Sequence, residues 1–230
     1  MTSRQATPVS IPASIARVPL RDQVHHAIVD RILRDDLKPG ARISDTALAR
    51  ELGVSRTPIR EALLRLEREG FLGADVGRGF FVKPLSVREM REVYSVLWTL
   101  EVLAMRSAAP LTEERAAALV RINTALEAEQ EPARRIDLDV EWHRTLLETS
   151  DNEYLRTTID SLKRVVRRYE YAYMLNAGFV PASTRSHEQI VAMAMAGDLD
   201  GAVRLLEDNW RLGMENLIVW LEERNASAGQ

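Results

Sequence analysis

Three side chains in the second half of the chain have the types and spacing to bind a metal ion. Asp139 and His143 lie four positions apart, so on a helix both side chains leave the same face and can bind one ion. His187 follows in a later expected helix and can close the site from across a bundle. An Asp-x-x-x-His pair also forms ordinary ion pairs on helix surfaces, so spacing alone leaves both interpretations open. The remaining histidines, His25 and His26, are expected to be surface or packing residues.

A second group of residues suits contact with DNA. The segment GVSRTPIREAL, residues 53–63, places Arg56, Thr57 and Arg60 within the first two turns of an expected helix, off its apolar face. An arginine there can donate two hydrogen bonds to O6 and N7 of guanine, and the hydroxyls of Ser55 and Thr57 can reach phosphates or bases. The amide groups of a helix N-terminus add attraction for phosphate. This segment is therefore predicted to read a DNA groove.

Short helices are expected to position this DNA-reading segment. Apolar residues recur at helical spacing over residues 20–35 and again over residues 55–69. Between them, Ser44 or Asp45 is a good N-cap for a short helix that ends at Gly53. The second and third helices are thus joined by a tight turn, which is typical of a helix-turn-helix.

A small hairpin is predicted to follow the third helix. Two β-type runs, around residues 71–72 and 80–82, flank a glycine-rich tip that contains Gly77 and Arg78. A long cation at such a tip can enter a minor groove or touch a phosphate. Three helices followed by a hairpin make a winged helix-turn-helix.

The rest of the chain is predicted to be helical throughout. Capping residues and prolines divide it into six helices, at about Ser86–Ala109, Thr112–Gln130, Pro132–Thr149, Asp151 or Asn152 to Asn176, Pro181–Gly197 and Asp198–Glu223. Short loops between successive helices favour an antiparallel six-helix bundle. The expected fold is therefore mainly α, with an N-terminal winged helix-turn-helix and a C-terminal bundle.

The charge of the chain changes sign between these two parts. Residues 1–85 contain 14 Lys and Arg against 10 Asp and Glu, a net charge of +4, whereas residues 86–230 contain 17 against 24, a net charge of −7. A basic first part suits a polyanionic partner. The predicted organisation is a disordered tail at 1–18, a DNA-binding domain at 19–83, a linker at 84–86 and a helical domain at 87–225.

Composition narrows the class of protein further. The chain has no cysteine, which excludes disulfides, thiolate metal sites and thiol nucleophiles. Its longest uncharged stretch, residues 171–184, has 14 residues and is shorter than the roughly 18 apolar residues that a membrane helix needs. No apolar segment of a secretory signal follows the first residues. We therefore expect a cytoplasmic protein with no membrane partner.

The N-terminal part resembles the DNA-binding domain of the GntR family of bacterial transcription regulators. The resemblance spans residues 20–82 and rests on PGARIS at 39–44, LARELGVSRTPIREAL at 48–63, LEREGF at 66–71 and the wing residues 77–79. It implies that Arg56, Thr57 and Arg60 contact bases or phosphates and that the wing flanks the site.

The C-terminal part, residues 86–222, resembles the FadR-type effector domain called FCD, in its six-helix VanR-like version. The shared features are Asp139-x-x-Trp-His143, Ser150-x-Asn152 and the segment from His187 to Gly197-Asp198. The resemblance implies a divalent metal ion of the Zn, Ni or Mn class. Its ligands would be Asp139, His143, His187 and the residue at position 209, which here is Asn209 instead of the family's histidine. An amide oxygen binds such ions more weakly than imidazole, so loose binding, completion by water or effector, and a vacant site all remain open.

The resemblance also implies a bound metabolite, with one departure from the family pattern. Leu97 stands where many members carry an arginine that binds a ligand carboxylate. A simple carboxylate therefore loses one anchor in this chain. Side chains that could still shape an effector pocket are Tyr94, Trp98, Arg164 and Arg168.

These features together predict an effector-responsive transcription regulator. It is expected to act as a repressor and to bind an inverted-repeat operator in double-stranded DNA as a homodimer, with 87–225 as the effector-binding and dimerisation domain. The main alternative is a metal-dependent enzyme built on Asp139, His143 and His187, but no general base is visible beside them and the DNA-reading segment would have no role. A purely architectural DNA protein would not require a large acidic bundle.

Overall fold

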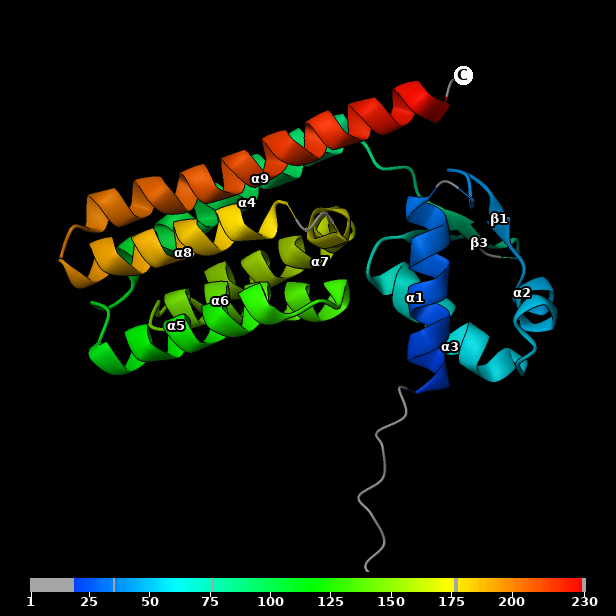
Figure 1. The fold of residues 1–230 in the computed structure, drawn as a ribbon, viewed down its shortest axis with the longest axis horizontal. Helices are drawn as coiled ribbons and strands as arrows, with labels where there is room; N and C mark the ends of the chain where they lie inside the picture. Colours follow the sequence, from blue (N-terminus) through cyan, green and yellow to red (C-terminus); the bar gives the residue numbers. More distant parts are fainter. Residues whose placement is uncertain (1–18, 35, 76, 176–177, 229–230) are drawn as a thin grey trace, which may run out of the picture.

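The computed structural model describes residues 19–34, 36–75, 77–175 and 178–228. The expected disordered tail, residues 1–18, lies outside the described residues. The N-terminal domain lies beside one end of the helical bundle (Figure 1). The expectation of a mainly helical chain with a small winged domain is confirmed.

The N-terminal domain contains three helices and a three-stranded sheet. Its elements are α1 (Leu20–Leu33), β1 (Arg42–Ile43), α2 (Asp45–Leu52), α3 (Arg56–Arg68), β2 (Leu72–Asp75) and β3 (Gly79–Val82). The strand order is β1-β3-β2, with both pairs antiparallel. Strand β1 was not predicted, because two residues are too short to show an alternating pattern. It ties the wing to the start of the helix-turn-helix, since Arg42 pairs with Phe81.

Local capping explains where the second helix begins and ends. The Ser44 hydroxyl accepts a hydrogen bond from the Ala47 amide, which satisfies one of the free donors at the start of α2. Gly53 ends that helix at φ 65°, a left-handed conformation that glycine adopts without a steric penalty. Helix α3 then buries Ile59, Leu63 and Leu66 fully in the domain core. Its opposite face and its N-terminus are left on the surface.

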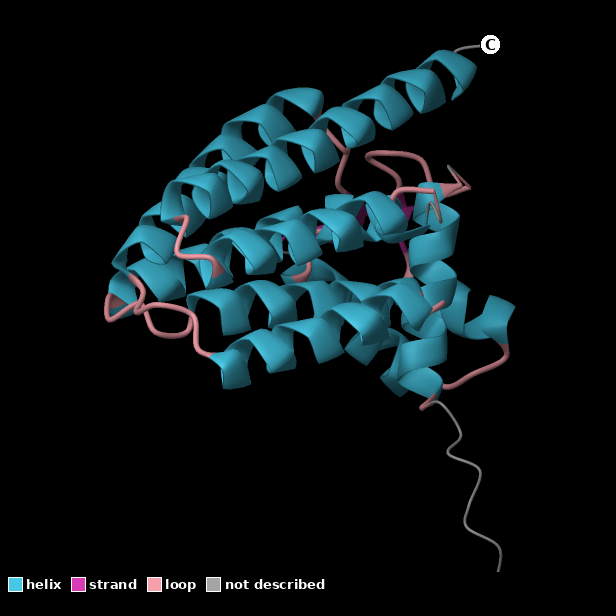
Figure 2. Ribbon diagram, turned by 60° about the vertical axis from the view of Figure 1, so that its left-hand side comes forward, coloured by secondary structure: helices cyan, strands magenta, loops and turns pink. Residues whose placement is uncertain are grey.

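Six helices form the C-terminal bundle. They are α4 (Val87–Ser107), α5 (Glu113–Ala128), α6 (Pro132–Leu147), α7 (Glu153–Leu175), α8 (Val180–Met195) and α9 (Leu199–Ala228). They run side by side and largely antiparallel (Figures 1 and 2). Helix α4 packs against α7 and α9, and α6 packs against α5 and α7. Ser86 and Thr112 cap α4 and α5 as expected from the sequence, while Glu131 caps α6.

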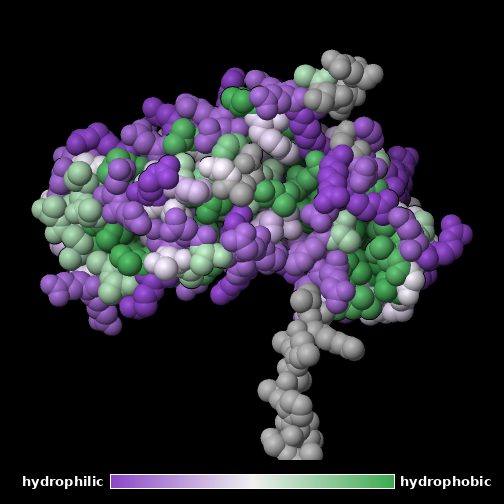
Figure 3. Space-filling view, viewed as in Figure 1, coloured by the Kyte–Doolittle hydropathy of each residue, from purple (hydrophilic) through white to green (hydrophobic). Residues whose placement is uncertain are grey.

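On the face shown in Figure 3, the bundle is mostly hydrophilic, with hydrophobic residues at the end away from the N-terminal domain. Met193, Met195 and Leu199, where α8 meets α9, are about two-fifths exposed. Two apolar residues of α4, Val96 and Leu103, are 48% and 51% exposed. They lie seven residues apart and so share one face of the helix.

Helix α7 makes the main polar contacts between the two domains. Arg168 donates to the carbonyl oxygen of Gly70 at 3.1 Å, and an ion pair with Glu89 of α4, within the bundle, holds its guanidinium there. Arg167 lies 3.6 Å from a carboxylate oxygen of Glu69. The ring of Tyr171 packs edge-on against that of Phe71, with centroids 5.9 Å apart. We call these contacts the α7 interface.

The connection between the domains is also held in place. The amide of Ser86 donates to the hydroxyl oxygen of Tyr169 at 3.2 Å, and that hydroxyl donates to Glu89 at 2.6 Å. Tyr169 is almost completely buried. The last residue before α4 is therefore attached to α7 as well as to its own helix.

Candidate functional site

Asp139, His143 and His187 meet in the centre of the bundle. Their possible ligand atoms all lie within 4.8 Å of one another, and all three side chains are buried. Asp139 and His143 come from α6, and His187 comes from α8. The Asp139 oxygens lie 3.8 Å from Nε2 of His143 and 3.7 Å from Nε2 of His187. The structure thus brings together three of the four residues that the resemblance implied as ligands.

A neighbouring amide fixes which nitrogen of His187 carries the proton. The Nδ2 of Asn123 donates to the carbonyl oxygen of Thr184 at 2.9 Å, so its Oδ1 is an acceptor. That oxygen lies 2.9 Å from Nδ1 of His187, which must then be the protonated nitrogen. Nε2 is left with a lone pair facing Asp139 and has no hydrogen-bond partner. Burial, with the nearby His143 and Lys163, also holds the pKa of His187 well below its usual value, so the ring is neutral.

His143 is oriented in the same way by a carboxylate. Its Nδ1 donates to Glu101 at 2.7 Å, which turns Nε2 toward Asp139. Glu101 also accepts from Trp210 at 2.7 Å and lies 3.0 Å from Nζ of Lys163. Burial alone would raise the pKa of Glu101, but the charges and hydrogen bonds of these neighbours outweigh it and lower the pKa to about 2. In metal sites, an oxygen acceptor behind each histidine usually holds the ring in place; here Glu101 supplies it for His143 and Asn123 for His187.

The fourth implied ligand, Asn209, lies on α9 at the edge of this cluster. It lines a small cavity of about 40 Å³ together with Tyr94, Asp139, His143 and Glu170. That volume suits an ion with one or two waters and is far too small for a metabolite. The Tyr94 hydroxyl has no hydrogen-bond partner.

Glu170 is a buried acidic residue that sequence reasoning missed. Its side chain is buried and neither carboxylate oxygen has a hydrogen-bond partner. Burial, and after it the charge of Asp139, raises the pKa of Glu170 to about 8. A signal was present in the sequence, since Lys163, Val166 and Glu170 recur at helical spacing and place two charged residues on the buried face of α7.

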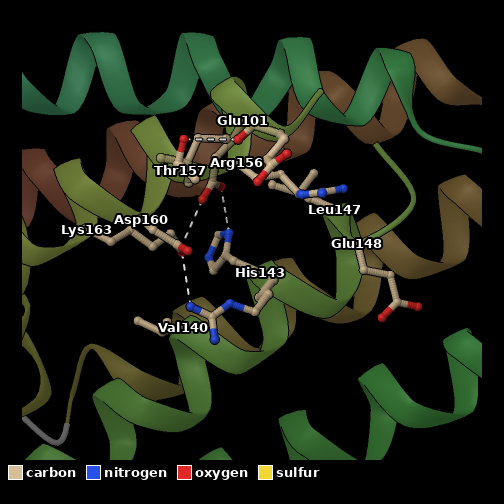
Figure 4. Close-up of a pocket in the computed structure, with 12 residues that line it drawn as sticks. Glu101, Val140, His143, Leu147, Glu148, Arg156, Thr157, Asp160 and Lys163 are labelled. Atoms are coloured by element: carbon tan, nitrogen blue, oxygen red, sulfur yellow. Dashed lines mark hydrogen bonds and ion pairs between the residues drawn. The ribbon is translucent and has the colours of Figure 1, made fainter. Parts of the chain in front are cut away.

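A larger cavity opens between α6 and α7 (Figure 4). It has a volume of about 380 Å³, which is within the range of small-molecule sites. Glu101, His143 and Lys163 reach it from the bundle interior. Apolar side chains of Val140, Leu147 and Ile159 line its walls, together with the polar residues Arg144, Glu148, Glu153, Arg156, Thr157 and Asp160. Arg144 and Asp160 form an ion pair of 3.1 Å across it.

The residues that the sequence suggested for an effector pocket lie in different places. Tyr94 lines the small cavity. Leu97 is fully buried in the core, and Trp98 is half-buried beneath the guanidinium of Arg211. Arg164 is exposed and donates to Ser161, and Arg168 belongs to the α7 interface. The last four therefore line neither the small cavity nor the one between α6 and α7.

The predicted DNA-reading residues lie together on the N-terminal domain. Ser55, Arg56, Thr57 and Arg60 are exposed at the start of α3, and the Ser55 side chain makes no capping hydrogen bond. Among the described residues, the Arg60 guanidinium makes no hydrogen bond or ion pair, and neither does that of Arg78. A groove between α3 and the wing is lined by Arg42, Ile43, Ser44, Asp45, Arg60, Arg78, Gly79 and Phe80.

Two other arginines on this surface are held by carboxylates. Arg56 donates to Asp45 at 2.8 Å, across the turn of the helix-turn-helix. Arg42 donates to Asp75 at 2.7 Å and to the carbonyl oxygen of Arg78 at 3.0 Å. The wing tip itself turns at Gly77, which has φ 76°. Arg42 therefore positions the wing, and Arg56 is oriented along the start of α3.

His25 is a packing residue, as expected from the sequence. It is buried in α1 and its Nε2 lies 2.5 Å from Glu69. His26 lies 3.3 Å from a carboxylate oxygen of Glu131, in the other domain. Both carboxylate partners are remote in sequence.

Comparisons with known proteins match both domains. Residues 20–82 match the family of bacterial regulatory proteins named gntR, and residues 92–211 match the FCD domain. Among curated relatives, the Nta operon transcriptional regulator of Aminobacter aminovorans is 35% identical over 133 residues, which are 56% of this chain and 63% of that protein. The regulator YdhC of Bacillus subtilis is 30% identical over 63% of this chain and 66% of its own length. The chain thus spans slightly less than two thirds of these two relatives.

Other similarities extend over most of the chain. The transcriptional regulator McbR of Escherichia coli is 27% identical over 90% of this chain and 96% of its own length. The repressor RspR of Escherichia coli is 23% identical over 82% of this chain and 84% of its own. The solved structure of Escherichia coli McbR/YncC has a TM-score of 0.59 at 25% identity and covers 91% of this chain and all of that one. Within the described residues, no helix is both long and apolar enough to cross a membrane.

Proposed function

The chain belongs to the GntR family of bacterial transcription regulators and carries an FCD domain, and from this we propose that it binds an inverted-repeat operator as a homodimer and represses transcription until an effector binds. That it is a regulator and not an enzyme follows from the family and its relatives. The alternative of a metal-dependent enzyme finds no support among them. The homodimer, the operator, the sign of regulation, the metal and a cytoplasmic location are parts of the proposal.

The main support for the proposed DNA binding is the exposed start of α3, where the guanidinium of Arg60 is unpaired. Arg60 has no partner among the described residues, so no ion pair must break before its guanidinium reaches a base. Arg56 would first have to leave Asp45, or would contact a phosphate while still paired. Arg78 at the wing tip lies beside the same groove and suits a phosphate or the minor groove.

Two observations support a homodimer: α4 has exposed apolar residues on one face, and a single helix-turn-helix reads only half of an inverted repeat. One helix-turn-helix reads a half-site, and a two-fold axis supplies the second. Val96 and Leu103 are about half exposed on a shared face of α4, with the partly buried Leu100 between them. A self-complementary apolar face of this kind is suited to a two-fold interface.

We propose a divalent ion of the Zn, Ni or Mn class for the cluster in the bundle. Asp139, His143 and His187 fit such an ion, because both histidines turn Nε2 toward Asp139 and the Nε2 of His187 has no hydrogen-bond partner. When bound, the ion supplies a Lewis acid that can hold an oxygen or nitrogen of a ligand. Asn209 faces the same small cavity and is placed to hold a water.

The effector is proposed to occupy the cavity between α6 and α7. Its volume suits a small metabolite, and its inner wall contains His143 and Lys163, next to the metal cluster. The first half of α7 lines this cavity, from Glu153 to Lys163. Arg167, Arg168 and Tyr171 of the same helix contact the N-terminal domain. A ligand that moves α7 would therefore move the DNA-reading surface. The similarity to the repressor RspR supports repression as the basal state.

Selection from a random double-stranded DNA library tests the proposed operator. Purified wild-type protein should enrich an inverted repeat, and its affinity should fall steeply with salt. Arg60→Ala should weaken binding by about 1–3 kcal/mol and relax the preference at one base pair in each half-site. Arg88→Ala is the matched control, since Arg88 is an exposed arginine of the bundle paired with Glu92. Full affinity and unchanged base preference in Arg60→Ala would show that the assigned reading face is wrong.

A further inference from the structure

We propose that Arg224, near the C-terminal end of α9, is a positioning residue that holds the DNA-binding domain at the end of α1. Through this contact α9 carries the state of the metal cluster to the DNA-reading surface, a role that rests on the ion and the homodimer of the proposed function. The α7 interface holds the same domain at residues 69–71, after α3. Helix α9 therefore adds a second and separate point of attachment.

The contact joins two residues that are 192 positions apart in the sequence. Nη2 of Arg224 donates to the carbonyl oxygen of Ile32 at 3.2 Å. Ile32 lies in the last turn of α1, where the last four carbonyl groups have no partner within the helix. The guanidinium supplies a donor there and places a positive charge at the negative end of the α1 dipole. Arg224 thus completes the end of a helix that belongs to the other domain.

The side chain of Arg224 is held in this direction by its own helix. Its guanidinium carbon lies over the ring of Trp220, one turn earlier in α9, at 5.6 Å from the ring centre. A cation in this position is attracted by the face of an indole ring. Trp220 is itself half-buried and packs against the core. The guanidinium is therefore oriented before it meets α1, and the contact costs little further side-chain freedom.

An earlier part of α9 packs against the groups that surround the metal cluster and the effector cavity. Trp210 is buried, and its indole N–H donates at 2.7 Å to Glu101, the carboxylate that also orients His143. The centres of the Trp210 and His143 rings are 4.9 Å apart, and Nζ of Lys163 lies 4.9 Å from the centre of the Trp210 ring. Because these side chains are in contact, a shift of His143 or Lys163 displaces Trp210 as well.

One unbroken helix joins Trp210 to Arg224. The two residues are fourteen positions apart in α9, which is about 21 Å along the axis at 1.5 Å per residue. Figure 1 shows α9 continuing beyond the end of α8, toward the side on which the N-terminal domain lies. A packed helix transmits a displacement along its length, so a tilt at Trp210 moves Arg224 and with it the end of α1. The metal cluster can thus act on the DNA-binding domain through α9 as well as through α7.

Operator binding by variants of Arg224 tests the positioning role. Wild type, Arg224→Met and Arg224→Lys are compared on the inverted repeat selected from the DNA library and on a duplex with only one half-site. Arg224→Met should weaken binding to the inverted repeat about three- to tenfold, because two loosely held domains lose more freedom when both bind. Its affinity for the single half-site should equal that of wild type, since the reading surface is intact. Arg224→Lys keeps a cation and a donor and should recover part of the loss.

Arg211→Met is the matched control. Arg211 lies on the same helix, and its guanidinium carbon is also 5.6 Å from the centre of a tryptophan ring, that of Trp98. Its ion-pair partner is Glu207. These partners belong to the bundle, so the variant loses a comparable stack and leaves the contact between Arg224 and Ile32 in place. Arg211→Met should therefore bind both duplexes as wild type does.

Hydrogen exchange with and without Zn²⁺ tests the coupling along α9. In chelator, Arg224→Met should raise the exchange of amides at the end of α1 at least about threefold over wild type, with the bundle unchanged. Saturating Zn²⁺ should change this exchange in wild type and in Arg211→Met. It should not do so in Arg224→Met, although competition with a chelator should give the same Zn²⁺ affinity for all three proteins.

The outcomes separate the parts of the proposal. Arg224 does not position the domain if Arg224→Met binds the inverted repeat as tightly as Arg211→Met, or loses equal affinity on both duplexes. The coupling is wrong if wild type takes up Zn²⁺ but the end of α1 exchanges at the same rate with and without it. Wild type that takes up no Zn²⁺, or selects no inverted repeat, would overturn the proposed metal site or operator and the coupling with it. Exchange at the end of α1 in chelator then decides the role of Arg224, since equal rates in Arg224→Met and wild type would overturn it.

Discussion

Substitution of Glu101 or Lys163 should destabilise the bundle more than most other single substitutions. Both side chains are almost completely buried, and the Lys163 Nζ lies 3.0 Å from a Glu101 oxygen. Glu101→Gln keeps the shape but removes the charge, so Lys163 becomes a buried cation without its carboxylate. Breaking one side of such a pair destabilises a protein by about 3–5 kcal/mol.

The reverse change should be milder. Lys163→Met leaves Glu101 with its hydrogen bonds from His143 and Trp210, at 2.7 Å each. We expect a loss of about 1–3 kcal/mol, the desolvation penalty of a charge that keeps part of its support. The double variant removes both charges, so its loss should be smaller than the sum of the single losses by about 2 kcal/mol or more.

Urea unfolding in the presence of a chelator, followed by tryptophan fluorescence, measures these losses. All four tryptophans, at positions 98, 142, 210 and 220, lie in the bundle, so the signal reports this domain alone. Glu92→Gln is the matched control, because Glu92 is an exposed member of an ion pair on α4. Strictly additive losses in the double variant would show that the Glu101 and Lys163 charges do not stabilise each other. A loss of stability below about 1 kcal/mol in Glu101→Gln would refute the same argument.

Two further predictions concern the contacts between the domains. Burial alone would raise the pKa of Glu69, but the hydrogen bonds and charges of His25, Arg65 and Arg167 outweigh it and lower the pKa below the usual 4.5. The ionised Glu69 therefore stabilises the fold above about pH 4.5, and this contribution is lost as the pH falls below that value. In urea unfolding, Glu69→Gln should be less stable than wild type at pH 7 and about as stable as wild type near pH 3. A difference that persists unchanged at pH 3 would refute this. Arg168→Met should lower the free energy of unfolding by about 2–4 kcal/mol and increase amide hydrogen exchange near Gly70. Arg164 is exposed, so Arg164→Met should do neither. Amides near Gly70 that stay protected in Arg168→Met would contradict the role of the α7 interface.

Most of the fold could be predicted from the sequence because its signals are local. Helix starts are marked by residues such as Ser86 and Thr112, which cap as expected, and Gly53 ends α2 in the left-handed conformation that only glycine adopts freely. Strand β1 escaped prediction because its two residues owe their strand conformation to pairing with β3, a partner nearly forty residues later.

The candidate site was predictable only in part, for a related reason. Asp139 and His143 share a helix face, so their spacing is visible in the sequence. The groups that orient the histidines come from other helices, Glu101 from α4 and Asn123 from α5, and no spacing connects them. Arg168 was suggested for the effector pocket, but its guanidinium contacts Gly70 of the N-terminal domain. Its position in the sequence does not show whether the side chain faces a pocket or the other domain.

The hydrogen bond from Ser86 to Tyr169 has a consequence for the spacing of the two half-sites. Because the connection before α4 is attached to α7, the N-terminal domain is held to the bundle in this conformation and does not swing as a tethered body. In the proposed dimer the separation and angular phase of the two reading helices would then be set by protein geometry. Each inserted base pair moves one half-site by about 3.4 Å and rotates it by about 35° around the duplex. The length of the operator's central spacer would therefore be as much a part of its recognition as the bases that Arg60 contacts.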